Sequence, residues 1–196
     1  MSVTADLLGT TYLLVPLLGG ALAHGLCVRF DWLPFLAHPI DGVRFIGGRR
    51  VFGENKTFRG PAALAAGTSL LMGIQTDLLH DVAALRALEL IDYSRINGWL
   101  VGACVGAAAM LAELPNSFLK RRLGVPPGQS AGGVKGWLLY AVDQVDLLAG
   151  VWLVVVVVIP SIVTPRRLLL SLGIVFVVHQ LTNIIGYTLG MRASRR

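Results

Sequence analysis

Long apolar runs constrain this chain more than any other feature of its sequence. A helix needs about 20 apolar residues to cross the hydrocarbon layer of a membrane. Five segments approach that length, and they cover residues 5–28, 60–79, 98–114, 147–163 and 168–191. Only 14% of the 196 residues are charged, whereas a soluble domain carries about 25%. The sequence therefore predicts an all-α, polytopic integral membrane bundle of about five transmembrane helices, forming one domain over residues 1–196.

Lysine and arginine are distributed unevenly between these segments. With five spans, residues 29–59, residues 115–146 and the tail lie on one side of the membrane and carry most of the basic side chains. The other side keeps Arg86, Arg95, Arg166 and Arg167. Because Lys and Arg favour the cytoplasmic side, we expect residues 29–59 and 115–146 to be cytoplasmic loops of a multi-pass protein in the cell (cytoplasmic) membrane. The N-terminus then lies outside.

Two parts of the predicted bundle allow more than one interpretation. In residues 81–96, the spacing of Val82, Leu85, Leu88 and Ile91 suits a short amphipathic helix at the membrane interface. A helical continuation of the preceding span fits equally well. Small residues dilute the second and third spans, and we expect them to pack helices closely, although they would also suit a groove for lipid chains.

The first cytoplasmic loop combines glycines with basic and hydroxyl side chains over residues 38–60. The side chains concerned are Arg49, Arg50, Lys56, Thr57 and Arg59. Glycine lets backbone amides approach a ligand closely, and free amides before a helix favour phosphate. The pattern indicates an anion site, without the GxxxxGK[ST] spacing of a P-loop. A plain basic loop facing anionic headgroups explains the same composition.

The second cytoplasmic loop mixes bases and acids over residues 113–146. Lys120, Arg121 and Arg122 suit phosphate groups. Asp143 and Asp146 are three residues apart, so on a helix they share one face. Two carboxylates at the head of an apolar span are costly unless they are paired or bind a metal, and such oxygen ligands suit Mg²⁺. Although arginines alone would neutralise the pair, both loops together favour a site of phosphoryl chemistry.

The last predicted span carries a polar stripe. His179, Asn183 and Tyr187 follow one another at intervals of four residues, so they lie on one helical face, and such a face normally turns toward the bundle. Hydrogen bonds between helices explain the stripe, and a contact with substrate or metal is the alternative.

Several runs of this sequence resemble a known family of membrane enzymes. SFLKRRLG (117–124) followed by DQVD (143–146) is similar to the S-F-x-K-R-R-x-G and D-Q-x-D pattern of the archaeal CDP-archaeol synthases, relatives of the bacterial CDP-diacylglycerol synthases. PID (39–41), GRR (48–50) and GENKTFRG (53–60) resemble earlier motifs of the same family. The polar stripe of the last span, with Gly190, also falls where that family has H, N, Y and G. The resemblance spans about residues 39–192.

The resemblance implies a Mg²⁺-dependent nucleotidyltransferase of phospholipid biosynthesis. Such a cytidylyltransferase uses CTP to convert a membrane lipid phosphate, of the archaetidic acid or phosphatidate type, into a CDP-activated lipid and pyrophosphate. The catalytic residues it implies are Lys120, Arg121, Asp143 and Asp146. The metal ligands it implies are Asp143, Asp146 and Glu113. The substrate-binding residues are Arg49, Arg50, Lys56, Thr57, Arg59, Asn116, Ser117 and Arg122.

The chain departs from the family pattern at three places. Ala112-Glu113 stands where the family often has Gly-Asp, Gly47 stands where it has Asp, and the stretch between Gly124 and Asp143 is longer than usual. These changes bear on lipid selectivity and suggest a bacterial branch. The expected partners are CTP, the lipid phosphate and the bilayer, without nucleic acid, and a homodimer is left open.

Two other classes of protein compete with this interpretation. A small ion-coupled transporter would use the polar stripe and the aspartates as a path, yet nearly all charge lies at the span ends. A non-catalytic scaffold that binds anionic lipid would tolerate loss of Asp143 or Asp146.

Overall fold

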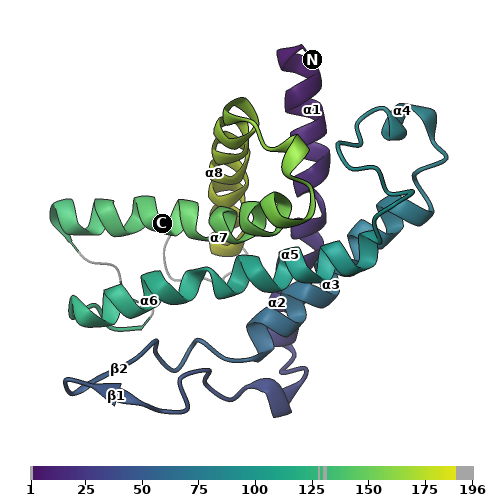
Figure 1. Ribbon diagram of the computed structural model, residues 1–196. Coiled ribbons are helices and arrows are strands. Elements are labelled where there is room, and N and C mark those ends of the chain that lie inside the picture. The colour runs from purple at the N-terminus through teal and green to yellow at the C-terminus, as the bar shows by residue number, and fades with distance from the viewer. Residues whose placement is uncertain (1, 128, 130–131, 189–196) are drawn as a thin grey trace.

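The computed structural model describes residues 2–127, 129 and 132–188, and these residues are almost entirely helical (Figure 1). The helices are α1 Val3–Leu14, α2 Pro16–Arg29, α3 Arg59–Asp77, α4 Ala83–Arg86, α5 Gly98–Leu111, α6 Glu113–Arg122, α7 Gly133–Val158 and α8 Pro165–Thr188. Two single turns of 3-10 helix, η1 Pro34–Leu36 and η2 Pro160–Ile162, join them. A short hairpin of β1 Phe45–Ile46 and β2 Arg49–Arg50 is the exception to the all-α prediction.

Three helical stretches of the described residues are long and apolar enough to cross a membrane. They are Val3–Arg29, Gly98–Arg122 and Gly133–Val158, which correspond to the first, third and fourth predicted spans. The second and fifth predicted spans are also helices, α3 and α8, and the count of five crossings stays a prediction. The chain is therefore a mainly helical protein with several helices that are long and apolar enough to cross a membrane.

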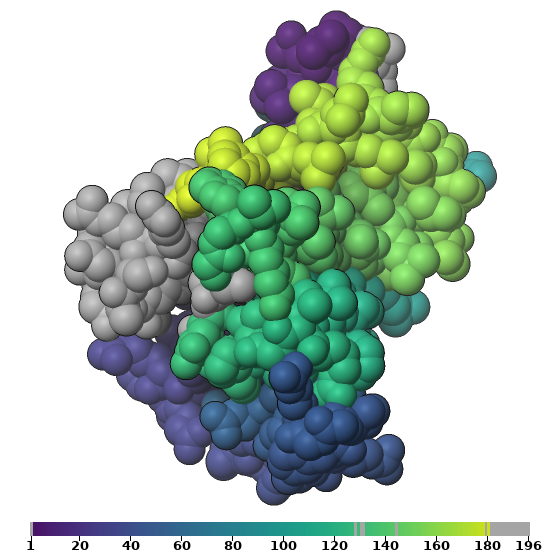
Figure 2. Space-filling model, turned by 90° about the vertical axis from the view of Figure 1, so that its left-hand side faces the viewer, coloured from purple at the N-terminus to yellow at the C-terminus, as the bar shows by residue number. Residues whose placement is uncertain are grey.

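Residues 115–158 form helices whose ends differ from those of the predicted fourth span and second loop. Helix α7 begins at Gly133 and ends at Val158, before Pro160. Proline has no N–H for the helical ladder and disfavours helix in the residue before it. Much of residues 115–146 is therefore helix rather than loop, divided between α6 and the first half of α7. In Figure 2 this first half of α7, in green, lies over the teal surface of α6.

Residues 81–96 form neither the predicted amphipathic helix nor a continuation of the preceding span. Helix α3 stops at Asp77, and the only helix in the segment is the four-residue α4. The remainder is an irregular connection that packs Ile91 into the core, where this side chain is 3% exposed. The His80 ring and the Glu89 carboxylate, 2.9 Å apart, close the connection.

Proline divides the first membrane-crossing stretch into α1 and α2. Pro16 cannot donate to the carbonyl oxygen of Tyr12, four residues earlier, so that acceptor needs another donor. The buried Gln75 of α3 supplies it, since its Nε2 donates to Tyr12 O at 3.0 Å. The break in one helix is thus compensated by a side chain of its neighbour.

Helix α3 lies between α2 and α5 at backbone contact distance, as the small residues predict. A Cβ atom on Gly67 would lie 2.3 Å from Gly19 O, and one on Gly106 would lie 2.4 Å from Leu64 O. Helix α7 approaches α5 in the same way, because a Cβ on Gly150 would lie 2.2 Å from Ala108 O. These glycines serve helix packing.

Gly106→Ala is expected to destabilise the bundle by about 1–3 kcal/mol, since the added methyl group would collide with the backbone of α3 rather than with a flexible side chain. The matched control is Gly25→Ala in α2, where a Cβ meets nothing within 4 Å. Thermal unfolding of the detergent-solubilised protein measures both. Equal midpoints for the two variants would contradict the close α3–α5 contact.

The two ends of the described chain are joined by ion pairs. Asp6 of α1 is 6% exposed, and its carboxylate accepts from Arg167 Nε at 3.0 Å and from Arg166 Nη1 at 3.1 Å. Trp152 of α7 donates to Ser171 of α8 at 3.2 Å. These contacts attach α8 to α1 and α7, apart from the polar cluster described next.

Candidate active site

Helix α6 carries a polar face directed at its neighbours. Glu113, Asn116 and Lys120 lie at positions i, i+3 and i+7, so they share one side of the helix. Asn116 is buried, and its Nδ2 donates to Asp143 Oδ1 and, at 2.9 Å, to Asp146 Oδ2. Lys120 Nζ forms an ion pair with Asp143. The predicted face shared by Asp143 and Asp146 on α7 is confirmed, and α6 covers it.

The loop of residues 38–60 reaches the same face of α6. Lys56 Nζ forms an ion pair with Glu113, and both side chains are largely shielded from solvent. Six predicted site residues thus come together from three parts of the chain. They are Lys56, Glu113, Asn116, Lys120, Asp143 and Asp146, and we call them the polar cluster.

The end of α6 explains the glycine of the K-R-R-x-G motif. Gly124 has φ +79°, its N–H donates to Arg121 O at 3.1 Å, and the N–H of Val125 donates to Lys120 O at 2.9 Å. This pair of bonds is a Schellman motif, in which glycine adopts the left-handed conformation that ends a helix. The motif therefore places its bases in the last turn of a helix rather than in a loop.

The remaining predicted site residues do not join the polar cluster. The Arg121 side chain is buried and donates to Val125 O, Arg122 donates to carbonyl groups of the hairpin, and Arg49 donates to carbonyl groups of α6. Arg59 pairs with Asp31 at 2.6 Å, and Ser117 is buried in α6. Thr57 forms an isolated β-bridge with Pro39, so its backbone helps to close the loop of residues 39–57.

Asp41 organises the loop of residues 38–60, a role that the sequence analysis missed. Its fully buried carboxylate pairs with Arg50 at 2.6 Å and accepts the backbone N–H groups of Val43, Phe52 and Gly53 at 3.0–3.3 Å. An aspartate that binds the amide two residues later is typical of a turn, and Asp41-Gly42 carried that signal. Burial alone would raise the pKa of Asp41, but Arg50 and the three amides bring it down to about 2.

Lowering the pH is expected to loosen this loop within a defined range. The folded pKa of Asp41 is about 2 against an ordinary value of 3.8, so its stabilising effect is complete above about pH 4 and is lost as the pH falls toward 2. Hydrogen exchange of the Val43, Phe52 and Gly53 amides, corrected for intrinsic rates, measures the loss. Asp41→Asn cannot ionise, so its protection should be low and nearly constant over this range. A wild-type protection that stays constant down to pH 2 would contradict this assignment.

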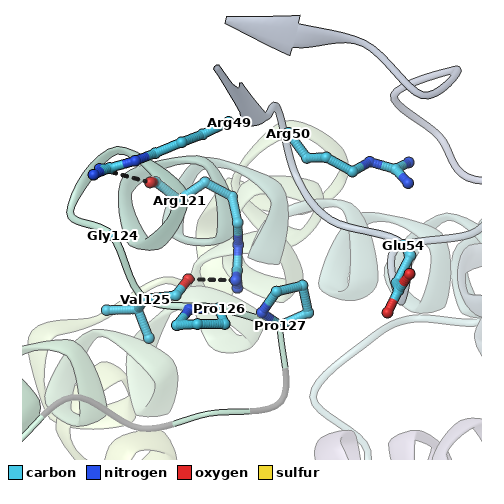
Figure 3. A pocket seen from close by; sticks show the side chains of 8 residues that line it. All are labelled: Arg49, Arg50, Glu54, Arg121, Gly124, Val125, Pro126 and Pro127. Atoms are coloured by element: carbon cyan, nitrogen blue, oxygen red, sulfur yellow. Dashed lines mark hydrogen bonds between the residues drawn. The ribbon is translucent and has the colours of Figure 1, made fainter. Parts of the chain in front are cut away.

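Two cavities adjoin the bases of α6. Arg49, Arg50, Glu54 and Arg121 surround the first, of about 360 Å³, with Gly124, Val125 and the proline pair 126–127 forming the rest of its wall (Figure 3). Arg121 Nε is buried there without a hydrogen-bond partner among the described residues. The second cavity, of about 520 Å³, has Lys120 and Asp143 in its wall beside aromatic side chains. These aromatic residues are Trp137, Tyr140 and Phe176. Val125 lines both cavities.

The polar cluster offers oxygen atoms that suit a hard divalent cation. Two carboxylates converge on the single Asn116 amide nitrogen, and the Asn116 Oδ1 atom is buried without a partner among the described residues. Within those residues no group of three His, Cys, Asp or Glu side chains forms a metal site, because Glu113 is turned to Lys56. The donors fit Mg²⁺ with retained waters better than a closed all-protein site.

The polar stripe of the last span lies outside these observations. Residues 179, 183 and 187 fall within α8, but their side chains are not among those described, and neither is any part of the tail beyond residue 188.

These features define an α-helical membrane protein with a charged site built from two helices and a loop. Comparison with known proteins gives the family: the CarS-like CDP-archaeol synthase family model matches residues 33–195, and the chain belongs to that family. The CDP-archaeol synthase of Saccharolobus islandicus (strain L.S.2.15 / Lassen #1) is 32% identical over 163 residues, covering 81% of this chain and 83% of that protein. That of Methanoculleus marisnigri is 32% identical over 161 residues, covering 79% and 87%.

A solved structure agrees with the fold. It is described as an intramembrane enzyme for archaeal membrane lipids biosynthesis and aligns with a TM-score of 0.59 at 22% identity. The alignment covers 88% of this chain and 91% of that one. The family predicted from the sequence motifs is confirmed by the family model and the relatives, and the fold agrees with that of the solved intramembrane enzyme.

Proposed function

We propose that the chain is a CTP-dependent cytidylyltransferase of membrane lipid biosynthesis. The observation that carries the proposal is the polar cluster. It brings together basic and acidic side chains from residues 56, 113–120 and 143–146. Membership of the CDP-archaeol synthase family supplies the reaction class. The substrates are CTP and a membrane lipid phosphate of the archaetidic acid or phosphatidate type.

The reaction needs positioning and charge neutralisation rather than a covalent nucleophile. An oxygen of the lipid phosphate attacks the α-phosphorus of CTP, the bond between the α- and β-phosphates breaks, and pyrophosphate leaves with the electron pair. Phosphoryl transfer of this kind depends on electrostatic stabilisation of the phosphate oxygens. Lys120 and Arg121 border the two cavities, so their positive charges are placed to neutralise the triphosphate and the leaving pyrophosphate.

The reaction is proposed to depend on Mg²⁺. Asp143 and Asp146 would hold the ion, with Asn116 beside them and Glu113 one helical turn away. When bound, the ion would neutralise and orient nucleotide phosphate oxygens. Lys120 pairs with Asp143 and Asn116 donates to both aspartates, which limits the cost of two carboxylates within an apolar helix.

We further propose five membrane crossings with the site at the cytoplasmic face of the cell membrane. The support is the accumulation of Lys and Arg in residues 29–59 and 115–146, together with the contact of these two regions through Lys56 and Glu113. CTP is available on that side, and the adjoining helices give the lipid chains an apolar surface.

Incorporation of labelled CTP into a lipid extract tests the function directly. Purified protein with Mg²⁺ is incubated with a panel of lipid phosphates that differ in ether or ester linkage, chain type and glycerol stereochemistry. Formation of a CDP-lipid from at least one member is the expected result, and it separates an enzyme from a transporter or a lipid-binding scaffold. Failure of the whole panel, archaetidic and phosphatidic acids included, would refute the proposal.

A further inference from the structure

Two arginines tie the β1–β2 hairpin to the end of α6. From α6, Arg122 Nη2 donates to the carbonyl oxygens of Arg49 at 2.9 Å and Arg50 at 2.7 Å, while its Nη1 donates to that of Ile46. From the hairpin, Arg49 Nη1 donates back to Arg122 O at 2.6 Å and Arg121 O at 3.4 Å, the latter drawn in Figure 3. We call these two side chains and the carbonyls that they bind the guanidinium clamp.

The Arg122 guanidinium has little capacity left for a phosphate. Bidentate binding of phosphate needs neighbouring N–H groups of the fork, and Nη1 and Nη2 of Arg122 already serve three carbonyl groups. The ring of Phe118, 5.1 Å from the guanidinium carbon, holds the side chain in this position by a cation–π contact. The fork is therefore engaged with the hairpin.

The carbonyls on both sides of the clamp need such donors. The last carbonyl groups of a helix lack partners within the helix, and a cation near that end is favoured by the helix dipole. Arg49 fills this role for α6. On the hairpin side, Gly47 and Gly48 form the turn with φ +56° and +73°, which presents the carbonyls of residues 46, 49 and 50 to Arg122.

We propose that Arg49 and Arg122 are positioning residues that hold the hairpin on α6, and that the Arg122 guanidinium is not a ligand of the substrate phosphates. The hairpin precedes Gly53, where a Cβ would lie 3.7 Å from Arg121 Nε, and Lys56, which reaches Glu113. The clamp thus sets where the first cytoplasmic loop meets the polar cluster. The expected effect on turnover rests on the proposed function, whereas the attachment of the hairpin to α6 does not.

The test compares Arg122→Ala and Arg122→Lys with the matched control Arg44→Ala. Arg44 lies on the same hairpin, is exposed and has no side-chain hydrogen bond or ion pair within the described part of the chain. Hydrogen exchange of peptides covering residues 38–58 measures docking, and CTP titration of the labelled-lipid assay measures kcat and KM. Loss of hydrogen bonds from a charged donor predicts a fall of about tenfold or more in kcat for both Arg122 variants.

Faster exchange over residues 38–58 in both Arg122 variants, with a CTP KM within about threefold of wild type, is the expected result. A CTP KM raised about tenfold or more with unchanged exchange would overturn the inference, because it would make Arg122 a phosphate ligand. Hydrogen exchange over α3 and α5 checks that a variant is folded. If Arg122→Ala does not fold, Arg122→Lys still provides the test. If the wild-type protein makes no CDP-lipid, the proposed function fails. The clamp is still tested in that case: faster hydrogen exchange over residues 38–58 in the Arg122 variants would support it, and unchanged exchange would refute it.

Discussion

Asp146→Asn is expected to lower the rate of CDP-lipid formation by about a thousandfold or more, the order seen when a member of a catalytic group is removed. Asparagine has the shape of aspartate, so the contact with Asn116 Nδ2 is retained through an amide oxygen. What is lost is one of the two negative charges that would hold Mg²⁺. The labelled-CTP assay with a saturating lipid phosphate measures the effect.

A second measurement separates this loss from a failure to fold. Ligands that bind only the folded protein raise its thermal midpoint, so Mg²⁺ with CTP should stabilise wild type but not Asp146→Asn. The control is Asp81→Asn, an exposed aspartate in the connection before α4, which should keep both the turnover and the thermal shift. An Asp146→Asn protein with near-normal turnover would refute the assignment of the polar cluster as the active site.

The sequence predicted the parts of the site that depend on helical periodicity. Asp143 and Asp146 share a helix face because they are three residues apart, and the same periodicity aligns Glu113, Asn116 and Lys120 on α6. It could not predict which partner each base would find, since that depends on contacts between residues distant in the chain. Arg121 and Arg122 follow Lys120 directly, yet the turn of the helix directs them to Val125 and to the hairpin instead.

The departure at Gly47 became interpretable only with the hairpin in view. The family has Asp before Gly-Arg-Arg, and the turn requires a left-handed residue at this position, with φ +56°. Glycine adopts that conformation freely, and aspartate is among the few other residues that tolerate it. The glycine at this position is therefore compatible with the turn. The Gly47-Gly48 pair is itself a signal for a two-residue hairpin turn, and the sequence analysis, which expected an anion site or a plain basic loop here, did not use it.

Hydrophobicity predicted that helices cross the membrane but not where they end. Apolar residues set the positions of α1–α2 and α5, whereas the ends of α6 and α7 follow Gly124 and Pro160, local signals that lie within or beside the apolar runs. The buried polar contacts of α1 show the same limit, because Asp6 meets Arg167 only once α8 has folded back against it.

Exchanging the charges of Lys56 and Glu113 is the second change expected to have a large effect. Lys56→Glu or Glu113→Lys alone places like charges together in a largely shielded contact, and leaving a partly buried charge unpaired is strongly destabilising. Each single variant should therefore undock residues 53–60 from α6 and lower turnover about a hundredfold, the equivalent of roughly 2.7 kcal/mol. Hydrogen exchange over this segment and the labelled-CTP assay measure the two effects.

The double variant Lys56→Glu/Glu113→Lys distinguishes a structural pair from a functional one. It restores an ion pair of reversed polarity, so the exchange protection of residues 53–60 should return. Turnover should stay low, because a cation at position 113 would replace a negative charge one helical turn from Asn116, which donates to both aspartates. Swapping the charges of the exposed pair Asp92 and Arg95, on the α4–α5 connection, should change neither the hydrogen-exchange protection of residues 53–60 nor the turnover, since surface pairs contribute little. Full recovery of turnover in the double variant would instead mean that Lys56 and Glu113 serve only to dock the loop, and that the chemistry belongs to Lys120, Asp143 and Asp146.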